Sequence, residues 1–581
     1  MRASILSRVA ILAGFAVALP HLFACLAHPV KPVQYDSAAA GDVGIALAIN
    51  KDVDILFVID NSGSMGEEQQ RLSGNFGSFI DVLEADDVKA NYRMAVTTTD
   101  FGNPRCTPDN FPRPANQGRF ALDSCRNRIG ADGGRNDFVF APEMIDATAA
   151  CTDFCDQGVH DALQGEWRPT SIEQDSSEEA RFWIENIEGQ LNLPSGVEAA
   201  ASGLGISAAN AAFRCLGPQG INGCGFESQL ESMWWALARA EQEGEVNYGF
   251  LRDAAILSIV HVTDEADCSF QTAQQNIFLD LNNQWSWEEG ASSPTSAVCW
   301  NAGVECDGAA PGPYTSCRTV NKDINGGTLA DDGSEDAKAV LIPLDKYIQQ
   351  INAIEQEKKM IDQNQEVLVS IIGGVPEGYE TMQAEIPYID NPDQAEQIKF
   401  GIGPGCTSGD GGSAIPPVRM RDFAEAFAVD GERNLFSICS ASYSAALDAI
   451  ANKIRDQIKP ACFKACVADS DPETEILEPE CTLVEENAAT GDQTPIPECG
   501  FDPDLGELVP PPGATACFVY RIDNPASPLT PSTLDDMQAE CLDAGWNLEF
   551  TLVRNSAAKA GSSVTATCVL SDLVQRDCPN L

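Results

Sequence analysis

Histidine is scarce in this chain, with 4 residues in 581. No His-Glu-x-x-His stretch occurs, which excludes a zinc protease of that type. No Gly-x-Ser-x-Gly follows an apolar strand, and no Gly-rich segment ends in the Lys-Ser/Thr pair that holds phosphate and magnesium. So acidic a chain could contain a carboxylate pair suited to glycoside hydrolysis, but no motif indicates one. We therefore expect a binding protein and not an enzyme.

Basic residues are also few. Lysine and arginine number 36 against 87 aspartates and glutamates, so the formal net charge is −51. A polyanion of this kind repels nucleic acid and anionic lipid headgroups, so neither is an expected partner. The alternative interpretation is that the charge serves only solubility, for example in a salty habitat where it is screened.

Long apolar runs are missing after the start of the chain. Residues 9–19 are apolar and follow two arginines, but they are too short for a membrane span, so residues 1–24 are expected to be a signal peptide. Residues 22–25 read Leu-Phe-Ala-Cys and resemble a bacterial lipobox, although Phe23 is bulkier than that pattern usually carries. The resemblance implies lipidation of Cys25 and a lipid anchor as the membrane contact. The alternative is ordinary secretory cleavage a few residues later and a secreted protein. Either way, the protein is expected to be exported to the cell envelope or beyond.

Cysteine usage agrees with export. The chain has 21 cysteines, and removing Cys25 leaves twenty, enough for ten disulfides in an oxidising compartment. A zinc site is less favoured, because the close spacings do not form a paired Cys-x-x-Cys set. The close pairs are Cys151/Cys155, Cys215/Cys224 and Cys462/Cys466. Connectivity cannot be read from the spacing.

Composition divides the chain into segments. Residues 25–50 begin with the candidate lipidated cysteine and are rich in Pro, Ala and Gly, as expected of a tether. Residues 51–459 carry alternating strand and helix patterns, interrupted by cysteine-containing insertions near 103–190 and 270–340. Residues 460–581 hold eight cysteines and a Pro-rich run, which indicates a small disulfide-rich module.

The alternating patterns predict an α/β fold. Apolar runs predict strands at 55–59, 92–96, 255–262, 367–372 and 435–439, and helical periodicity predicts helices around 72–83, 227–240, 341–358 and 447–458. Such an order favours a doubly wound, mostly parallel sheet. The C-terminal module is expected to be β-rich, with strands at 518–522, 546–553 and 563–570.

One strand ends in an unusual turn. Ile55 to Ile59 are all apolar, and the turn that follows carries Asp60, Ser62 and Ser64 at alternate positions. An unbroken apolar run fits a strand covered on both faces, and ligands of parallel sheets bind at the carboxyl ends of the strands. Alternating oxygen donors on one loop suit a hard divalent cation. The alternative is that Ser64 caps the helix that begins nearby.

The Asp-x-Ser-x-Ser pattern after a buried strand resembles the metal-ion-dependent adhesion site of a von Willebrand factor type A domain. With Asn61 and Met65 it is similar to the versions in bacterial envelope proteins. The resemblance covers roughly residues 52–459 and implies a Rossmann-like sheet. The family uses a second carboxylate after a later strand, and Asp264, in Val-Thr-Asp-Glu after residues 255–262, matches it. The alternative for Asp264 is a helix cap or a solvated loop acid.

The chain departs from the family pattern at one position. The family usually places a threonine in a Gly-rich loop before a middle helix, but residues 222–227 read Asn-Gly-Cys-Gly-Phe-Glu. Cys224 or Gly225 occupies that position, and a disulfide-bonded cysteine is no ligand for a hard cation. Glu227 or a water could substitute. If nothing does, the site is degenerate and the protein has a structural role.

The resemblance implies a function in adhesion or complex assembly. Asp60, Ser62, Ser64 and Asp264 would hold a divalent cation, with Mg²⁺ as the expected ion and Ca²⁺ or Mn²⁺ as alternatives. Open coordination positions would accept a carboxylate from a protein partner. The two insertions leave strand ends at the same edge of the sheet, so we expect them to form a rim around the site.

Overall fold

The computed structural model describes most of the chain after residue 50. The described residues are 44–46, 51–85, 88–107, 114–130, 135–140, 144–174, 177–280, 285, 294–361, 365–409, 411–428, 433–458, 462–463, 465–471, 477–487, 493–502, 507–522, 537, 541–542, 544–554 and 562–581. The expected signal peptide and Cys25 lie outside these residues. Within them, no helix combines the length and the apolar character that crossing a membrane requires.

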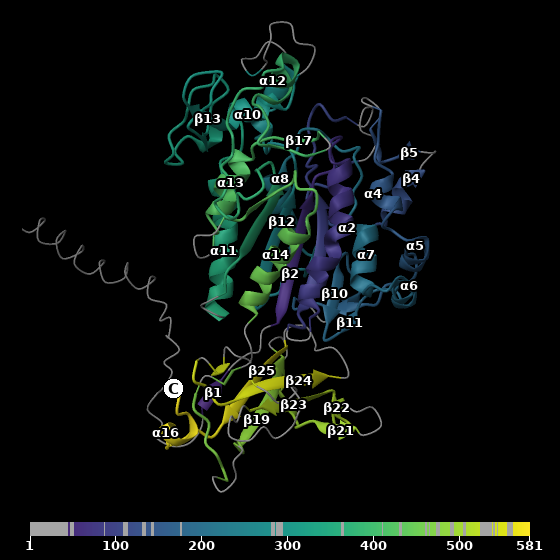
Figure 1. The fold of residues 1–581 in the computed structure, drawn as a ribbon, viewed down its shortest axis with the longest axis vertical. Helices are drawn as coiled ribbons and strands as arrows, with labels where there is room; N and C mark the ends of the chain where they lie inside the picture. Colours follow the sequence, from purple (N-terminus) through teal and green to yellow (C-terminus); the bar gives the residue numbers. More distant parts are fainter. Residues whose placement is uncertain are drawn as a thin grey trace, which may run out of the picture.

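A seven-stranded, mostly parallel sheet forms the centre of the molecule (Figure 1). Its strands in spatial order are β11 (Gln190–Leu191), β10 (Ile184–Ile187), β3 (Asn91–Thr98), β2 (Asp52–Ile59), β12 (Ile256–Val262), β15 (Leu368–Gly373) and β18 (Leu435–Ser437). The five strands from β3 to β18 are parallel, whereas β10 runs antiparallel to β3 and the short edge strand β11 runs antiparallel to β10. The fold is therefore a mixed α/β structure around this sheet.

Helices cover both faces of the sheet because the side chains of each strand alternate between them. In β2, Phe57 and its odd-numbered neighbours face one core, and Leu56 and Val58 face the other. The first core lies under α2 (Gly66–Leu83), α6 (Gly196–Leu204), α7 (Ala208–Leu216) and α14 (Ser444–Gln457). The second lies under α8 (Gln229–Ala240), α11 (Asp345–Ile361) and α13 (Val418–Glu425). Each fully buried Leu or Phe stabilises this arrangement by roughly 1.5–3 kcal/mol.

The region expected to be a first insertion is only partly one, because β10 and β11 at its end belong to the central sheet. Ile184 pairs with Met94 of β3, so this part of the chain completes the core. The other elements of the region are short. They are η2 (Cys125–Arg128), β4 (Ile129–Gly130), β5 (Arg135–Asn136), β6 (Val139–Phe140), β7 (Ile145–Asp146), α4 (Ala149–Thr152), α5 (Gln157–Leu163), β8 (Thr170–Ser171) and β9 (Glu178–Glu179). Of these, α4, α5, β4 and β5 lie on the side of α2 and α7 (Figure 1).

A second group of short elements lies beyond one end of the sheet (Figure 1). It packs around a small core of its own that includes Phe278, Val298 and Leu341. Its elements between β12 and α11 are η3 (Thr272–Gln274), α9 (Asn276–Leu279), α10 (Ala297–Gly303), β13 (Val304–Asp307), β14 (Ser316–Thr319) and η4 (Asp336–Lys338). Between β15 and β18 the chain adds α12 (Gln394–Phe400), β16 (Cys406–Thr407) and β17 (Ser413–Ala414).

The C-terminal residues form a separate β-rich body at the other end of the sheet (Figure 1). Its core includes Phe463, Phe518 and Phe550. The strands are β19 (Cys481–Asn487), β20 (Gln493–Ile496), β21 (Gly500–Asp502), β22 (Glu507–Val509), β23 (Ala516–Arg521), β24 (Glu549–Arg554) and β25 (Ser562–Cys568), followed by α16 (Val574–Asp577). Strand β1 (Gly44–Ala46), from the expected tether, pairs with β25. The last part of that tether is therefore a strand of this body.

All cysteines except Cys25 form disulfides, as the cysteine count predicts. The six bonds in residues 106–439 are Cys106–Cys224, Cys125–Cys151, Cys155–Cys215, Cys268–Cys299, Cys306–Cys317 and Cys406–Cys439. The four in the C-terminal body are Cys462–Cys541, Cys466–Cys578, Cys481–Cys568 and Cys499–Cys517. Each body is therefore crosslinked internally, which suits a protein in an oxidising compartment.

Candidate metal centre

The two predicted carboxylates follow neighbouring parallel strands. Ile59 at the end of β2 pairs with Val262 at the end of β12, and the Asp60 amide donates to the Val262 carbonyl at 2.9 Å. The chain leaves β2 toward β3 on one side and returns later to β12 on the other. This makes the carboxyl ends of β2 and β12 a topological switch point, where open α/β sheets bind ligands. Asp60 and the loop that carries Asp264 therefore meet at this point.

The turn after β2 is held in place by its own hydrogen bonds. The Ser62 amide donates to Asp60 Oδ1 at 2.8 Å, and the hydroxyl oxygens of Ser62 and Ser64 are 3.3 Å apart. Gln69 Nε2 on α2 donates to the Asp60 carbonyl at 2.7 Å. The N-cap residue of α2 is Met65, and no side chain caps that helix end. Ser64 is exposed and is not the cap of the helix, and its hydroxyl hydrogen-bonds to the Asp264 carboxylate.

Thr263 connects the two strand ends through its side chain. Its hydroxyl donates to Asp60 Oδ2 at 2.6 Å and accepts a hydrogen bond from Gln229 Nε2 at 2.9 Å. The next two residues, Asp264 and Glu265, lie in a loop and not in a helix. Asp264 is therefore not a helix cap, and its side chain is only 7% exposed, which also excludes a solvated loop acid.

Several buried carboxylate oxygens near Asp60 have no hydrogen-bond donor. Both carboxylate oxygens of Glu227 lack a partner, as do Asp264 Oδ1 and Glu265 Oε2. Asp60 and Glu227 are 0% exposed. A buried carboxylate without donors costs several kcal/mol unless it is protonated or binds a cation. The donor set therefore fits a divalent cation, which would supply the positive charge that these residues lack.

The carboxylates also disfavour one another's charge. Burial raises the pKa of Glu227 well above its usual range, and the nearby charges of Asp60 and Glu265 raise it further. Burial does the same to the pKa of Asp264, again reinforced by Asp60 and Glu265. The pKa of Glu265 is raised to about 8, mainly by burial and then by Asp60, while Lys399 partly offsets the effect. Burial also raises the pKa of Asp60, although the Thr263 hydroxyl lowers it. A bound cation would relieve this repulsion.

The geometry limits how many carboxylates can reach one ion directly. Among the described residues, the one set of three His, Cys, Asp or Glu side chains whose donor atoms all lie within 4.8 Å of one another is Cys125, Cys151 and Cys155. No three carboxylates in this part of the chain come so close. Direct ligands from at most two carboxylates would leave hydroxyls and waters to complete the shell of an ion.

The Gly-rich loop before α8 carries the departure from the family pattern. Cys224 is bonded to Cys106, so it is not a ligand for a hard cation. The Gly223 amide donates to the Asn61 carbonyl at 2.8 Å, and a Cβ on Gly223 would lie 2.4 Å from Asn61 Oδ1. The loop therefore packs directly on the turn after β2. The charged group that it offers to the site is Glu227.

Residues from both expected insertions contact the site. A Cβ at Gly63 would lie 2.8 Å from the Phe140 ring, which belongs to the first region. Ser296 in the second donates to the Gly225 carbonyl at 3.2 Å. These contacts place parts of both regions at the rim of the candidate site.

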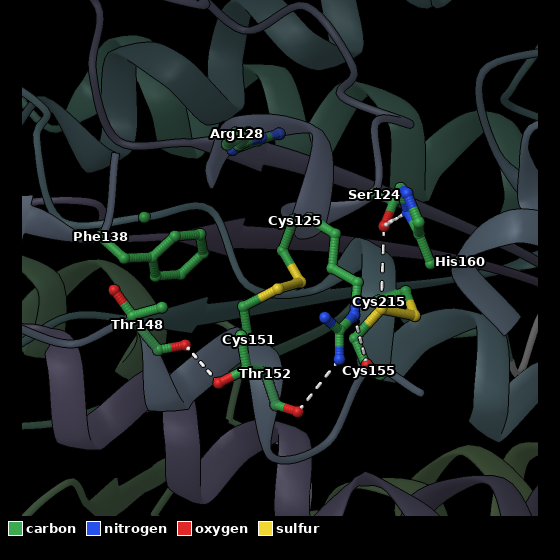
Figure 2. Close-up of a disulfide and its surroundings, with 12 residues drawn as sticks. Ser124, Cys125, Arg128, Phe138, Thr148, Cys151, Thr152, Cys155, His160 and Cys215 are labelled. Carbon is green, nitrogen blue, oxygen red and sulfur yellow. Dashed lines mark hydrogen bonds between the residues drawn. A yellow bond between two sulfur atoms is a disulfide. The ribbon is translucent and has the colours of Figure 1, made fainter. Parts of the chain in front are cut away.

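The cluster of three cysteine sulfurs is not a zinc site. Cys125 is bonded to Cys151, and Cys155 is bonded to Cys215, so the cluster consists of two adjacent disulfides (Figure 2). His160 lies beside them and is 2.9 Å from the Ser124 hydroxyl (Figure 2). The other close pairs in the sequence are likewise divided among different disulfides, because each of their cysteines bonds to a more distant partner. Thiolates, the form that binds zinc, are therefore missing here.

The sequence patterns did not identify every polar residue of the candidate site. Thr263, Glu265 and Gln69 contribute hydrogen bonds or charge, and Thr99 and Asp100 follow the neighbouring strand β3 and are buried. The signal for Thr99 and Asp100 was their position after an apolar strand. Burial of Glu265 carries no such signal, because a charged residue next to a loop aspartate is ordinarily exposed.

Comparisons with known proteins add little to the geometry. No protein-family model matches the chain, and no curated protein matches it. Among solved structures, it is similar to the pilus adhesin SpaC from Lactobacillus rhamnosus GG, with 10% identity, a TM-score of 0.23, and coverage of 89% of this chain and 39% of SpaC. The open conformation of SpaC gives 9% identity, a TM-score of 0.25, and coverage of 89% and 38%. The chain thus spans about two-fifths of the length of that adhesin, and a similarity of this extent assigns no function.

Proposed function

We propose that the protein is an exported surface protein that binds a protein partner through a divalent cation on a von Willebrand factor type A domain. Asp60, Ser62, Ser64 and Asp264 would hold the ion directly or through water, and Glu227 would be an auxiliary ligand of the ion or of one of its waters. The observation that carries the proposal is the group of buried carboxylate oxygens without donors at the carboxyl ends of β2 and β12. The parallel order of β3, β2, β12, β15 and β18 supports the domain type.

The proposed role is binding and not catalysis. An ion at this place supplies a Lewis-acidic centre to which a partner's carboxylate can bind. The protein's own residues fix the two strand ends and exclude water from most of the site. His261 lies on β12, the strand that leads to Asp264, and it is fully buried. Burial lowers its pKa to about 3. It would therefore stay neutral inside the core and away from any substrate.

A second candidate role is structural, with a cation that only stabilises the fold. The observation that favours it is the Cys106–Cys224 disulfide, which replaces the expected hydroxyl ligand, together with a third carboxylate, Glu227, next to the site. Asp60 and Asp264 already balance the charge of a divalent ion, so a third carboxylate would make the site net negative and reduce its attraction for an incoming anion. The two roles differ in whether the bound ion keeps exchangeable water.

Manganese(II) distinguishes the two roles, because proton relaxation of the solvent reports how many waters a bound Mn²⁺ keeps. The expected result is strong relaxation enhancement that falls when a short peptide rich in aspartate is added, since its carboxylate displaces water. Bound Mn²⁺ that shows no enhancement, or enhancement unchanged by the peptide, would support the structural role. A peptide with asparagine at the same positions is the matched control.

We further propose that Cys25 carries a lipid that anchors the protein to a membrane of the cell envelope. The other twenty cysteines bond to one another, so Cys25 has no cysteine of this chain left to pair with. A Cys25→Ser variant should move from the membrane fraction to the soluble fraction and lose incorporation of labelled fatty acid. Retention of both by the variant would contradict the anchor.

A further inference from the structure

A second candidate binding site lies outside the carboxylate cluster. A cavity of about 1050 Å³ opens between α8, α11 and the loops that follow β3 and β12. This volume is at the upper end of the roughly 300–1,000 Å³ typical of small-molecule sites. Its lining comes from helices and loops and not from strands, so it offers no free strand edge to an extended peptide.

Three partly exposed aromatic rings line the cavity: Phe101, Trp234 and Phe270. Each of these three rings contacts another aromatic ring. Trp235 lies edge-on to Trp234 at 5.1 Å and stacks against Phe101 at 6.2 Å, measured between ring centroids. Phe270 packs edge-on against Phe278 at 4.9 Å. The rings are therefore held in fixed positions, which lowers the entropy cost of binding against them.

Amide side chains supply most of the uncharged polar lining, and two of them have unused hydrogen-bonding capacity. Asn103 is 7% exposed, and its Oδ1 accepts from the Arg105 amide at 3.0 Å, whereas its Nδ2 has no partner. Gln350 Nε2 donates to the Trp234 carbonyl at 3.0 Å, whereas its Oε1 has no partner. Gln117, Gln271, Gln275 and Gln349 add four further amides. The unpartnered atoms of Asn103 and Gln350 are themselves enclosed by protein, so the exposed amides of Gln275 and Gln349 are the donors and acceptors within reach of a ligand.

The charges around the cavity disfavour an anionic ligand. Lys346 is the cationic residue in the lining of the cavity. Its Nζ lies 4.1 Å from the centre of the Trp234 ring and 2.6 Å from Glu231 Oε2. Glu231 also accepts from the Tyr347 hydroxyl at 2.9 Å. The positive charge is therefore already compensated, and two further aspartates line the cavity.

We propose that this cavity binds a neutral oligosaccharide. The apolar faces of sugar rings would stack on Trp234 and the other aromatic rings of the lining, and sugar hydroxyls, which donate and accept at once, would bond to the exposed amides of Gln275 and Gln349. Compensated charge and the absence of a strand edge in the lining favour this ligand over an acidic sugar or an extended peptide. The site goes beyond the proposed cation-dependent function and does not depend on it.

The test is a calorimetric titration of the oxidised full chain with five tetrasaccharides. Four are neutral, namely cellotetraose, maltotetraose, mannotetraose and N-acetylated chitotetraose, and the fifth is the acidic tetragalacturonate. At least one neutral sugar should bind, and Trp234→Ala should weaken its affinity by about tenfold or more. Trp167→Ala, at a partly buried tryptophan that packs against the other core, should leave it unchanged.

Gln349→Ala guards against a misfolded tryptophan variant. The Gln349 side chain is exposed and lines the cavity, so the fold should persist while sugar affinity falls. Near-ultraviolet circular dichroism checks that the fold is intact. Binding of none of the neutral sugars, tighter binding of tetragalacturonate, or sugar affinity unchanged in both variants would overturn the proposal.

Discussion

Glu265→Gln is expected to stabilise the cation-free protein at neutral pH. The Glu265 side chain is 9% exposed, its Oε2 has no hydrogen-bond donor, and its pKa is raised from 4.5 to about 8. Because the pKa is higher in the folded protein, folding favours the protonated form. The stability from this group is fully present below pH 4.5 and is lost as the pH rises through about 8.

The magnitude follows from the span between these values. Each pH unit between the unfolded and folded pKa changes the free energy of unfolding by about 1.4 kcal/mol. From 4.5 to neutrality is about 2.5 pH units, so the proton that Glu265 must take up on folding costs about 3 kcal/mol at pH 7. Glutamine has the same shape and no charge. With a chelator present, the free energy of unfolding of Glu265→Gln should therefore exceed that of the wild type by about 3 kcal/mol at pH 7. Near pH 4.5 the difference should be much smaller.

The assay is guanidinium unfolding of the disulfide-intact protein, followed by tryptophan fluorescence at both pH values. Saturating calcium should reduce the difference in free energy of unfolding between Glu265→Gln and the wild type, because a bound cation favours the charged carboxylates of the wild type. Glu305→Gln is the matched control, since Glu305 forms an exposed ion pair with Arg318 worth at most about 1 kcal/mol. A stability difference for Glu265→Gln that is the same at both pH values would refute the reasoning.

Two further substitutions test the core and the site turn. Asp54→Asn should destabilise the protein by about 3 kcal/mol in guanidinium unfolding, because it leaves Arg252, whose Nε lies 2.9 Å from Asp54 Oδ1, as a buried charge with a weakened partner. Gly223→Ala should weaken cation binding in calorimetry, because its Cβ would lie 2.4 Å from Asn61 Oδ1 and displace the turn after β2. Gly203→Ala is the control, since nothing lies within 4 Å of its Cβ.

Each of these two predictions has an outcome that would contradict it. A loss below about 1 kcal/mol for Asp54→Asn would show that Arg252 is compensated by other groups, such as the Asp52 carboxylate at 3.3 Å. Equal cation affinity in Gly223→Ala and Gly203→Ala would show that the loop before α8 does not shape the site.

The parallel core was predictable from the sequence because its strands are buried on both faces. β2, β12 and β15 are mainly apolar and buried along almost their whole length, and this pattern separates them from amphipathic helices. β10 was missed because it is a short strand with Glu185 and Asn186 at its centre. α6 and α7 were missed because their many alanines give no clear apolar stripe, although α7 is buried along most of its length.

The candidate site was predictable only where a motif marks it. Asp60 and Asp264 each follow an apolar strand, and the structure places those strands side by side. The sequence does not reveal that Glu265 is buried, nor that Thr263 donates to Asp60, because both depend on how distant loops pack over the strand ends. Disulfide connectivity was unpredictable for the same reason, since Cys106 and Cys224 are separated by 118 residues in the sequence and are brought together by the fold.

Cation binding to the oxidised protein is the most direct test of the central claim. Calorimetric titration with Mg²⁺ and Ca²⁺ should show one site in the wild type, which is lost in Asp60→Ala and weakened in Glu227→Gln. Asp323→Ala, at an exposed turn far along the chain, should bind as the wild type does. Absence of binding by the correctly oxidised wild type, or equal binding by Asp60→Ala, would contradict the metal centre and leave the buried carboxylates protonated.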